Sequence, residues 1–86
     1  MEQQEYKAID AILNAHSQEE VKFFVDDMIR SMQQRVHDYD EISLFTERVL
    51  NRLQLFNPFQ TSSREWSNIK LAGILFNRVR SRYLAV

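Results

Sequence analysis

Glycine and proline each occur only once in this chain of 86 residues. An all-β domain reverses its direction about every dozen residues, and its turns depend on residues of these two types. The chain therefore lacks the residues that a β-sandwich or a β-barrel requires. Apolar residues instead recur at helical spacing along most of the sequence. We expect an all-α fold, a compact bundle of about four helices.

The composition indicates a single globular domain. A chain of this length buries only about 60–65% of its unfolded surface, so we expect a thin core. Hydrophobic residues make up 44% of the sequence, which is too apolar for a disordered chain. No run approaches the roughly 18 apolar residues of a membrane span, and the first residues are acidic and polar, unlike a signal peptide. We expect residues 1–86 to form one cytoplasmic domain without membrane contact.

Two serine–glutamate pairs predict where helices begin. In a capping box, a serine accepts a hydrogen bond from the backbone three residues later, and a glutamate at that position returns the bond. Ser17 with Glu20 and Ser62 with Glu65 both have this spacing. Together with the apolar pattern, they predict helices over residues 2–15, 18–37, 41–56 and 63–84.

The only proline, Pro58, predicts the end of the third helix. The residue before a proline is pushed out of helical geometry, so the helix should stop by Asn57. We expect Phe59, in the loop that follows, to fold back onto the core. A DNA-binding helix-turn-helix needs a turn of three or four residues, and the connection from Phe56 to Ser62 is too long for one.

The predicted last helix carries apolar residues on two opposite faces. We expect Trp66 and Phe76, on the broader face, to be core residues, whereas the second face holds Leu71, Ile74 and Leu75. Three interpretations fit this pattern: the chain covers this helix on both sides, the helix is bent or misassigned, or the second face associates with another molecule. We favour the last of them. The predicted partner-binding residues are Leu44, Leu55, Leu71, Ile74 and Leu75, in a protein complex or a homodimer.

Two further residues of this helix are unusual for a helix that packs on a core. Gly73 costs about 0.5–1 kcal/mol relative to alanine, and we interpret it as allowing a helix or an aromatic ring to approach the backbone closely. Arg80 falls on the main apolar stripe, where an unpaired guanidinium is prohibitively costly. We expect its side chain to reach solvent near the helix end, with an ion pair to an acidic residue as the alternative.

Residues suited to catalysis or metal binding are few. The absence of cysteine removes disulfides, thiolate zinc sites and cysteine nucleophiles. Neither His16 nor His37 follows a glutamate by three residues, as the ligands of di-iron helices require. Residues 37–41 are acidic but lack the glycine and the distal glutamate of an EF-hand loop, and helix capping explains them. We expect no catalytic residue, metal or cofactor.

Charge is distributed unevenly along the chain. Residues 1–43 carry a net charge of −6 and residues 44–86 a net charge of +5. The two halves either pair within the fold, or Arg78, Arg80 and Arg82 contact an acidic partner or nucleic acid. A pI of about 6.1 is far from the basic balance of a nucleic-acid binder. The sequence therefore predicts a non-enzymatic protein–protein interaction or regulatory module, with a nucleic-acid-associated regulator as the alternative.

Overall fold

The computed structural model describes residues 2–35 and 39–84 of the chain. These residues form four helices, α1 (Glu2–Asn14), α2 (Gln18–Arg35), α3 (Tyr39–Leu53) and α4 (Ser63–Leu84). The structure thus confirms the prediction of an all-α bundle of four helices. The last two residues of the predicted second helix, including His37, lie outside the described residues.

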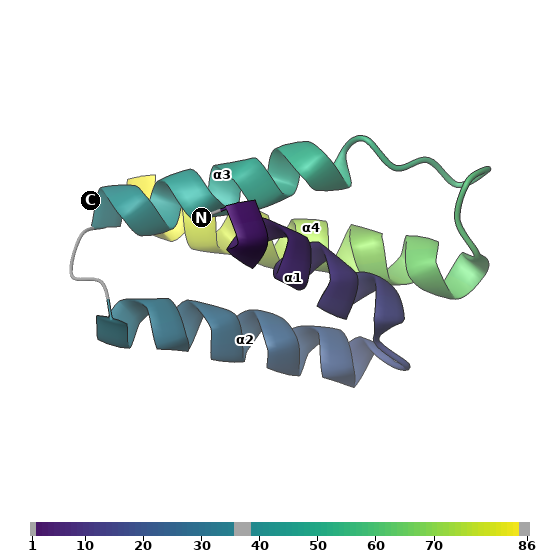
Figure 1. The fold of residues 1–86 in the computed structure, drawn as a ribbon, viewed down its shortest axis with the longest axis horizontal. Coiled ribbons are helices and arrows are strands. Elements are labelled where there is room, and N and C mark those ends of the chain that lie inside the picture. The colour runs from purple at the N-terminus through teal and green to yellow at the C-terminus, as the bar shows by residue number, and fades with distance from the viewer. Residues whose placement is uncertain (1, 36–38, 85–86) are drawn as a thin grey trace.

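The longest helix, α4, is central to the arrangement. It contacts each of the other three helices. In Figure 1, α2, α3 and α4 run along the long axis of the molecule, and α1 lies in front of α4 between α2 and α3. The radius of gyration is 12.4 Å, close to the roughly 12 Å of a compact domain of this length. The chain therefore covers α4 on several sides by itself, which accounts for part of its two-sided apolar pattern.

Each helix contributes one apolar side to a common core. Ile12 of α1, Val25 of α2, Val49 of α3 and Phe76 of α4 are fully buried there. Phe76 thus occupies the position predicted for it. Trp66 is only half-buried and packs against the edge of the core, because it lies on the flank of α4.

The two predicted capping boxes differ in detail. Ser62 and Glu65 form a complete box, because the Glu65 backbone N–H donates to Ser62 Oγ at 3.1 Å and the Ser62 N–H donates to Glu65 Oε1 at 2.9 Å. At the start of α2, the Glu20 N–H donates to Ser17 Oγ, but the Glu20 carboxylate accepts from the N–H of His16. That carboxylate thus reaches one residue further back than a capping box requires.

The connection from α3 to α4 corrects two predictions. Helix α3 ends at Leu53, earlier than predicted, because the chain tightens into three-residue turns, with the Phe56 N–H bonded to the Leu53 carbonyl. Phe59 does not fold back onto the core but is exposed. The Asn57 side-chain oxygen accepts from the backbone N–H groups of Phe59 and Gln60, which fixes the loop, and Phe56 packs against the core instead.

Candidate protein-interaction surfaces

One side of α4 faces away from the rest of the bundle. We call it the outer face of α4, and its exposed residues are Lys70, Ile74, Asn77 and Ser81. Ile74 is the large apolar residue of this face, and it is 51% exposed. Leu71 and Leu75 lie on the flank next to the core and are half-buried against it. The structure therefore separates the predicted group, with Ile74 on the surface and the two leucines largely within the chain's own packing.

The two predicted residues outside α4 are exposed. Leu44 on α3 is 42% exposed, and Leu55, just after α3, is 77% exposed. Leu44 lies in the first half of α3, whereas Leu55 lies in the turn that follows the end of the helix at Leu53. Both side chains are exposed, and their role in extending an apolar surface of α4 stays a prediction.

The structure corrects the interpretation of Gly73. A Cβ atom added at this position would meet nothing within 4 Å outside its own helix turn. No helix or ring of this chain approaches the backbone there, so the glycine is not required by packing within the described residues. Gly73 instead borders the outer face of α4, next to Ile74.

The three predicted arginines of α4 point in two directions. Arg78 and Arg82 line a groove between α2 and α4, whereas Arg80 is half-buried and donates a hydrogen bond to Asn77 Oδ1 at 2.8 Å. Within the described part of the chain, Arg80 has no carboxylate partner. This agrees with the prediction that its side chain reaches the surface without a buried ion pair.

The groove between α2 and α4 combines an apolar floor with basic rims, and we call it the α2–α4 groove. Its volume is about 550 Å³. The apolar floor consists of Val25 and Ile29 of α2 with Leu75 and Val79 of α4. Four cations and one carboxylate line the rims together with Gln33, and these charged residues are Lys22, Asp26, Arg30, Arg78 and Arg82.

The four cations of the groove have no acidic partner among the residues that the structure describes. Lys22, Arg30, Arg78 and Arg82 are all exposed, and among the described residues no carboxylate lies within ion-pairing distance of them. Their positive charge is therefore available to another molecule. The arginines of α4 were predicted as contact residues from the sequence, whereas Lys22 and Arg30 were not. Their spacing of eight residues, which puts both on one face of a helix, was the available signal.

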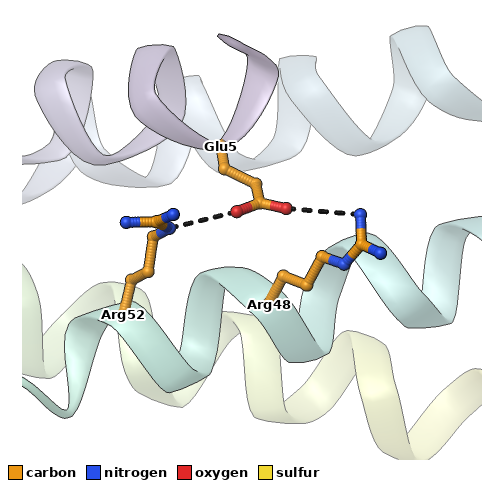
Figure 2. Close-up of polar contacts among 3 residues, drawn as sticks. All are labelled: Glu5, Arg48 and Arg52. Atoms are coloured by element: carbon orange, nitrogen blue, oxygen red, sulfur yellow. Dashed lines mark hydrogen bonds and ion pairs between the residues drawn. The ribbon is translucent and has the colours of Figure 1, made fainter. Parts of the chain in front are cut away.

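A buried carboxylate elsewhere ties α1 to α3. Glu5 of α1 is only 4% exposed, and Figure 2 shows it between two arginines of α3. Arg52 Nε lies 3.0 Å from Glu5 Oε2, and Arg48 Nη1 lies 3.6 Å from Glu5 Oε1. The Arg52 guanidinium also stacks over the ring of Tyr6, 4.4 Å from its centroid. The acidic and basic halves of the chain therefore pair in part within the fold, as one of the two sequence interpretations expects.

The contacts of Arg52 favour its charged form. The hydrogen bond to Glu5 raises the pKa of Arg52 above its ordinary value, burial opposes this shift, and Tyr6 adds to it. Arg52 is therefore charged at any pH at which the protein is studied. The cluster is a structural tie between two helices, because its three charged groups are already paired with one another.

Asn68 forms a second polar contact that the sequence analysis missed. This buried residue of α4 donates from its side-chain nitrogen to the backbone carbonyls of Ile12 at 3.0 Å and Ala15 at 2.9 Å. The last carbonyls of a helix have no partner within the helix, and Asn68 binds one of them, that of Ile12, together with the carbonyl of Ala15, which follows α1. It therefore fixes the end of α1 against α4.

Comparisons with protein families, with curated proteins and with solved structures find no match for this chain. Among the described helices, none combines the length and the hydropathy that crossing a membrane requires. Residues 2–35 and 39–84 contain no group of three or more histidine or acidic side chains placed to hold a metal ion. The two surfaces that remain as candidates are the outer face of α4 and the α2–α4 groove.

Proposed function

We propose that this protein is a non-enzymatic interaction module that associates with a second copy of itself through α3 and α4. The observation that supports the proposal is the outer face of α4. This helix contacts all three other helices, yet Ile74 in the middle of it stays half-exposed. An apolar residue at the centre of a helix face, beside a glycine that leaves room, suits the approach of another helix.

The charges beside these residues are complementary between α3 and α4. Helix α3 exposes Leu44 and the carboxylate of Glu47, whereas α4 exposes Ile74 with Lys70. A two-fold axis would lay α3 of one copy over α4 of the other, because the same patch serves both subunits in such a dimer. Each apolar residue would then be buried, and Glu47 would face Lys70 of α4 in the second copy. We include a cytoplasmic location and a regulatory role in this proposal. The cytoplasmic location is supported by the lack of a long apolar run and by the acidic, polar first residues.

The substitution Ile74→Glu tests the proposal. We expect sedimentation velocity to show wild-type dimers at micromolar concentration and monomers for the variant, because a charge would lie at the centre of the contact. Phe23→Glu is the matched control, since Phe23 is an exposed apolar residue on α2, outside the proposed contact. Substitutions of Leu71 or Leu75 are unsuitable, because both residues pack against the core and a charge there would also destabilise the fold.

Two results would contradict the proposal. One is a wild-type protein that remains monomeric at about 100 μM, a concentration at which even a weak dimer is populated. The other is dissociation of the dimer by Phe23→Glu to the same extent as by Ile74→Glu. Circular dichroism of each variant shows whether a loss of association comes from unfolding.

Nucleic-acid binding is the alternative function, and the four unpaired cations of the α2–α4 groove are the observation that favours it. Binding to phosphates weakens steeply between about 50 and 200 mM salt, whereas an apolar contact between proteins changes little. A duplex or single-stranded oligonucleotide that binds at micromolar concentration with this salt dependence would support the alternative.

A further inference from the structure

We propose that the α2–α4 groove binds an acidic amphipathic helix of a partner protein. The inference rests on the proposed function only in treating the chain as an interaction module, because the groove lies on the α2 side of α4 and not on its outer face. The occupant is identified by its chemistry, a helix with one narrow apolar stripe and carboxylates on both sides of the stripe.

The spacing of the lining residues fits a helix that lies along the groove. On each wall the floor residues are one turn apart, Val25 and Ile29 on α2 and Leu75 and Val79 on α4. The lining of α2 extends from Lys22 to Gln33, which corresponds to about 16 Å, or three helical turns. A guest helix of about three turns would therefore lie along the whole groove, with its middle turn beside the apolar floor.

The rims select for negative charge on both sides of such a guest. Lys22 and Arg30 lie on one wall, and Arg78 and Arg82 lie on the other. All four are free of carboxylate partners among the described residues. A helix with glutamates flanking its apolar stripe would pair with both walls at once, which a partner charged on one side only could not do.

The apolar floor favours a protein helix over nucleic acid. A phosphate backbone gains nothing from the apolar side chains of the floor. An apolar stripe would gain from contact with Leu75, which is the half-buried member of the floor. The other three floor residues, Val25, Ile29 and Val79, are already buried, so the groove is shallow. The charged residues of the rims therefore account for much of the selectivity for an acidic guest helix.

The test uses a synthetic probe with the proposed chemistry. The probe is a fluorescein-labelled helical peptide of about 14 residues, with leucines at positions i, i+3, i+4 and i+7 and glutamates on both flanks. A second peptide carries glutamine at every glutamate position. We expect fluorescence anisotropy to show micromolar binding of the acidic peptide at 50 mM salt and at least tenfold weaker binding of the neutral one.

The arginines of α4 provide a matched pair of variants. Arg78→Gln with Arg82→Gln removes two charges from the groove, and Arg80→Gln removes one charge of the same helix outside the groove. We expect the double variant to bind the acidic peptide about tenfold more weakly, and Arg80→Gln to change binding by less than about twofold. Arg30→Gln, on the opposite wall, should weaken binding about threefold, because a guest helix contacts both walls.

Several outcomes would overturn the inference. The acidic peptide would fail to bind at 200 μM, or the neutral peptide would bind as tightly as the acidic one. Arg80→Gln would weaken binding of the acidic peptide as much as the double variant does. An oligonucleotide with the same charge as the acidic peptide would bind more tightly than the peptide. Sedimentation of the same samples separates this inference from the proposed function. If the wild-type protein is a dimer but does not bind the peptide, only the proposal for the groove is contradicted. If it is a monomer that binds the peptide, only the proposal of self-association is contradicted.

Discussion

At the scale of single residues, Gly73 is the position where the chain departs most clearly from the best choice for its own stability. Open space surrounds the missing Cβ, so Gly73→Ala introduces no clash. We expect the substitution to raise the free energy of unfolding by about 0.5–1 kcal/mol, because alanine loses less backbone entropy in a helix. Urea unfolding at a concentration where the chain is monomeric measures this change.

The control for Gly73→Ala is Lys70→Gly, one turn away on the same exposed side of α4. It should lower the free energy of unfolding by about the same amount, since a glycine loses more backbone entropy than a lysine when the helix forms. A loss of stability with Gly73→Ala would show that this backbone makes a close contact, and the interpretation of Gly73 as an open position would be wrong.

Asn68 is the residue whose chemistry is most tightly specified by its surroundings. Its amide donates to two backbone carbonyls in a buried place, so a carboxylate at this position would face two acceptors without a proton to share. We expect Asn68→Asp to cost about 2–4 kcal/mol at pH 7, although the two side chains have nearly the same shape. Asn77→Asp, on the exposed side of the same helix, should change stability by less than about 0.5 kcal/mol.

At the scale of elements, the start of α4 depends on the charge of Glu65. The hydrogen bond from the Ser62 backbone N–H, and then that with the Ser62 side chain, lowers the pKa of Glu65 below its ordinary value of 4.5. As the pH falls, the Glu65 carboxylate is therefore protonated in the unfolded chain near pH 4.5, whereas in the folded state it is protonated only at a lower pH. The contribution of the cap is thus complete above about pH 5 and is lost as the pH falls through the folded-state pKa.

The difference in stability between wild type and Glu65→Ala measures this contribution. It should be largest near pH 7 and should shrink as the pH falls below about 5, whereas Glu65→Gln should show no such change relative to Glu65→Ala, because its amide oxygen accepts at every pH. A wild-type advantage that stays constant over the whole acid range in which the protein remains folded would show that the charged form is not the one that caps the helix.

The pairing of α1 with α3 depends on Glu5. Glu5→Gln keeps the shape of the side chain but removes the charge between Arg48 and Arg52, and we expect it to cost about 1–3 kcal/mol in urea unfolding. Glu47→Gln removes an exposed acid and should change stability by less than about 0.5 kcal/mol. If Glu5→Gln leaves the free energy of unfolding unchanged, the two arginines stabilise the fold through packing alone.

The sequence was sufficient to predict elements whose signals are local. The four helices, the capping box of Ser62 and Glu65, and the burial of Phe76 follow from spacing and side-chain chemistry within one turn or two. The contacts of Glu5 and Asn68 were not predictable, because they join residues 43 to 56 positions apart along the chain. The same holds for the α2–α4 groove, whose two walls come from helices that the sequence does not pair.

At the scale of the whole molecule, the position of α4 determines how the chain unfolds. This helix contacts every other helix, and Asn68 and Phe76 fix it to α1 and to the core, so the loss of any other helix from the bundle exposes part of α4. We therefore expect one cooperative transition.

Trp66, the single tryptophan, reports on α4 through its fluorescence, while far-ultraviolet circular dichroism reports on all helices. At one protein concentration the two urea transitions should coincide, and Phe76→Ala should shift both together by about 3–5 kcal/mol. A fluorescence transition at clearly lower urea than the circular dichroism transition would show that α4 leaves a bundle that survives without it, which would contradict its central role.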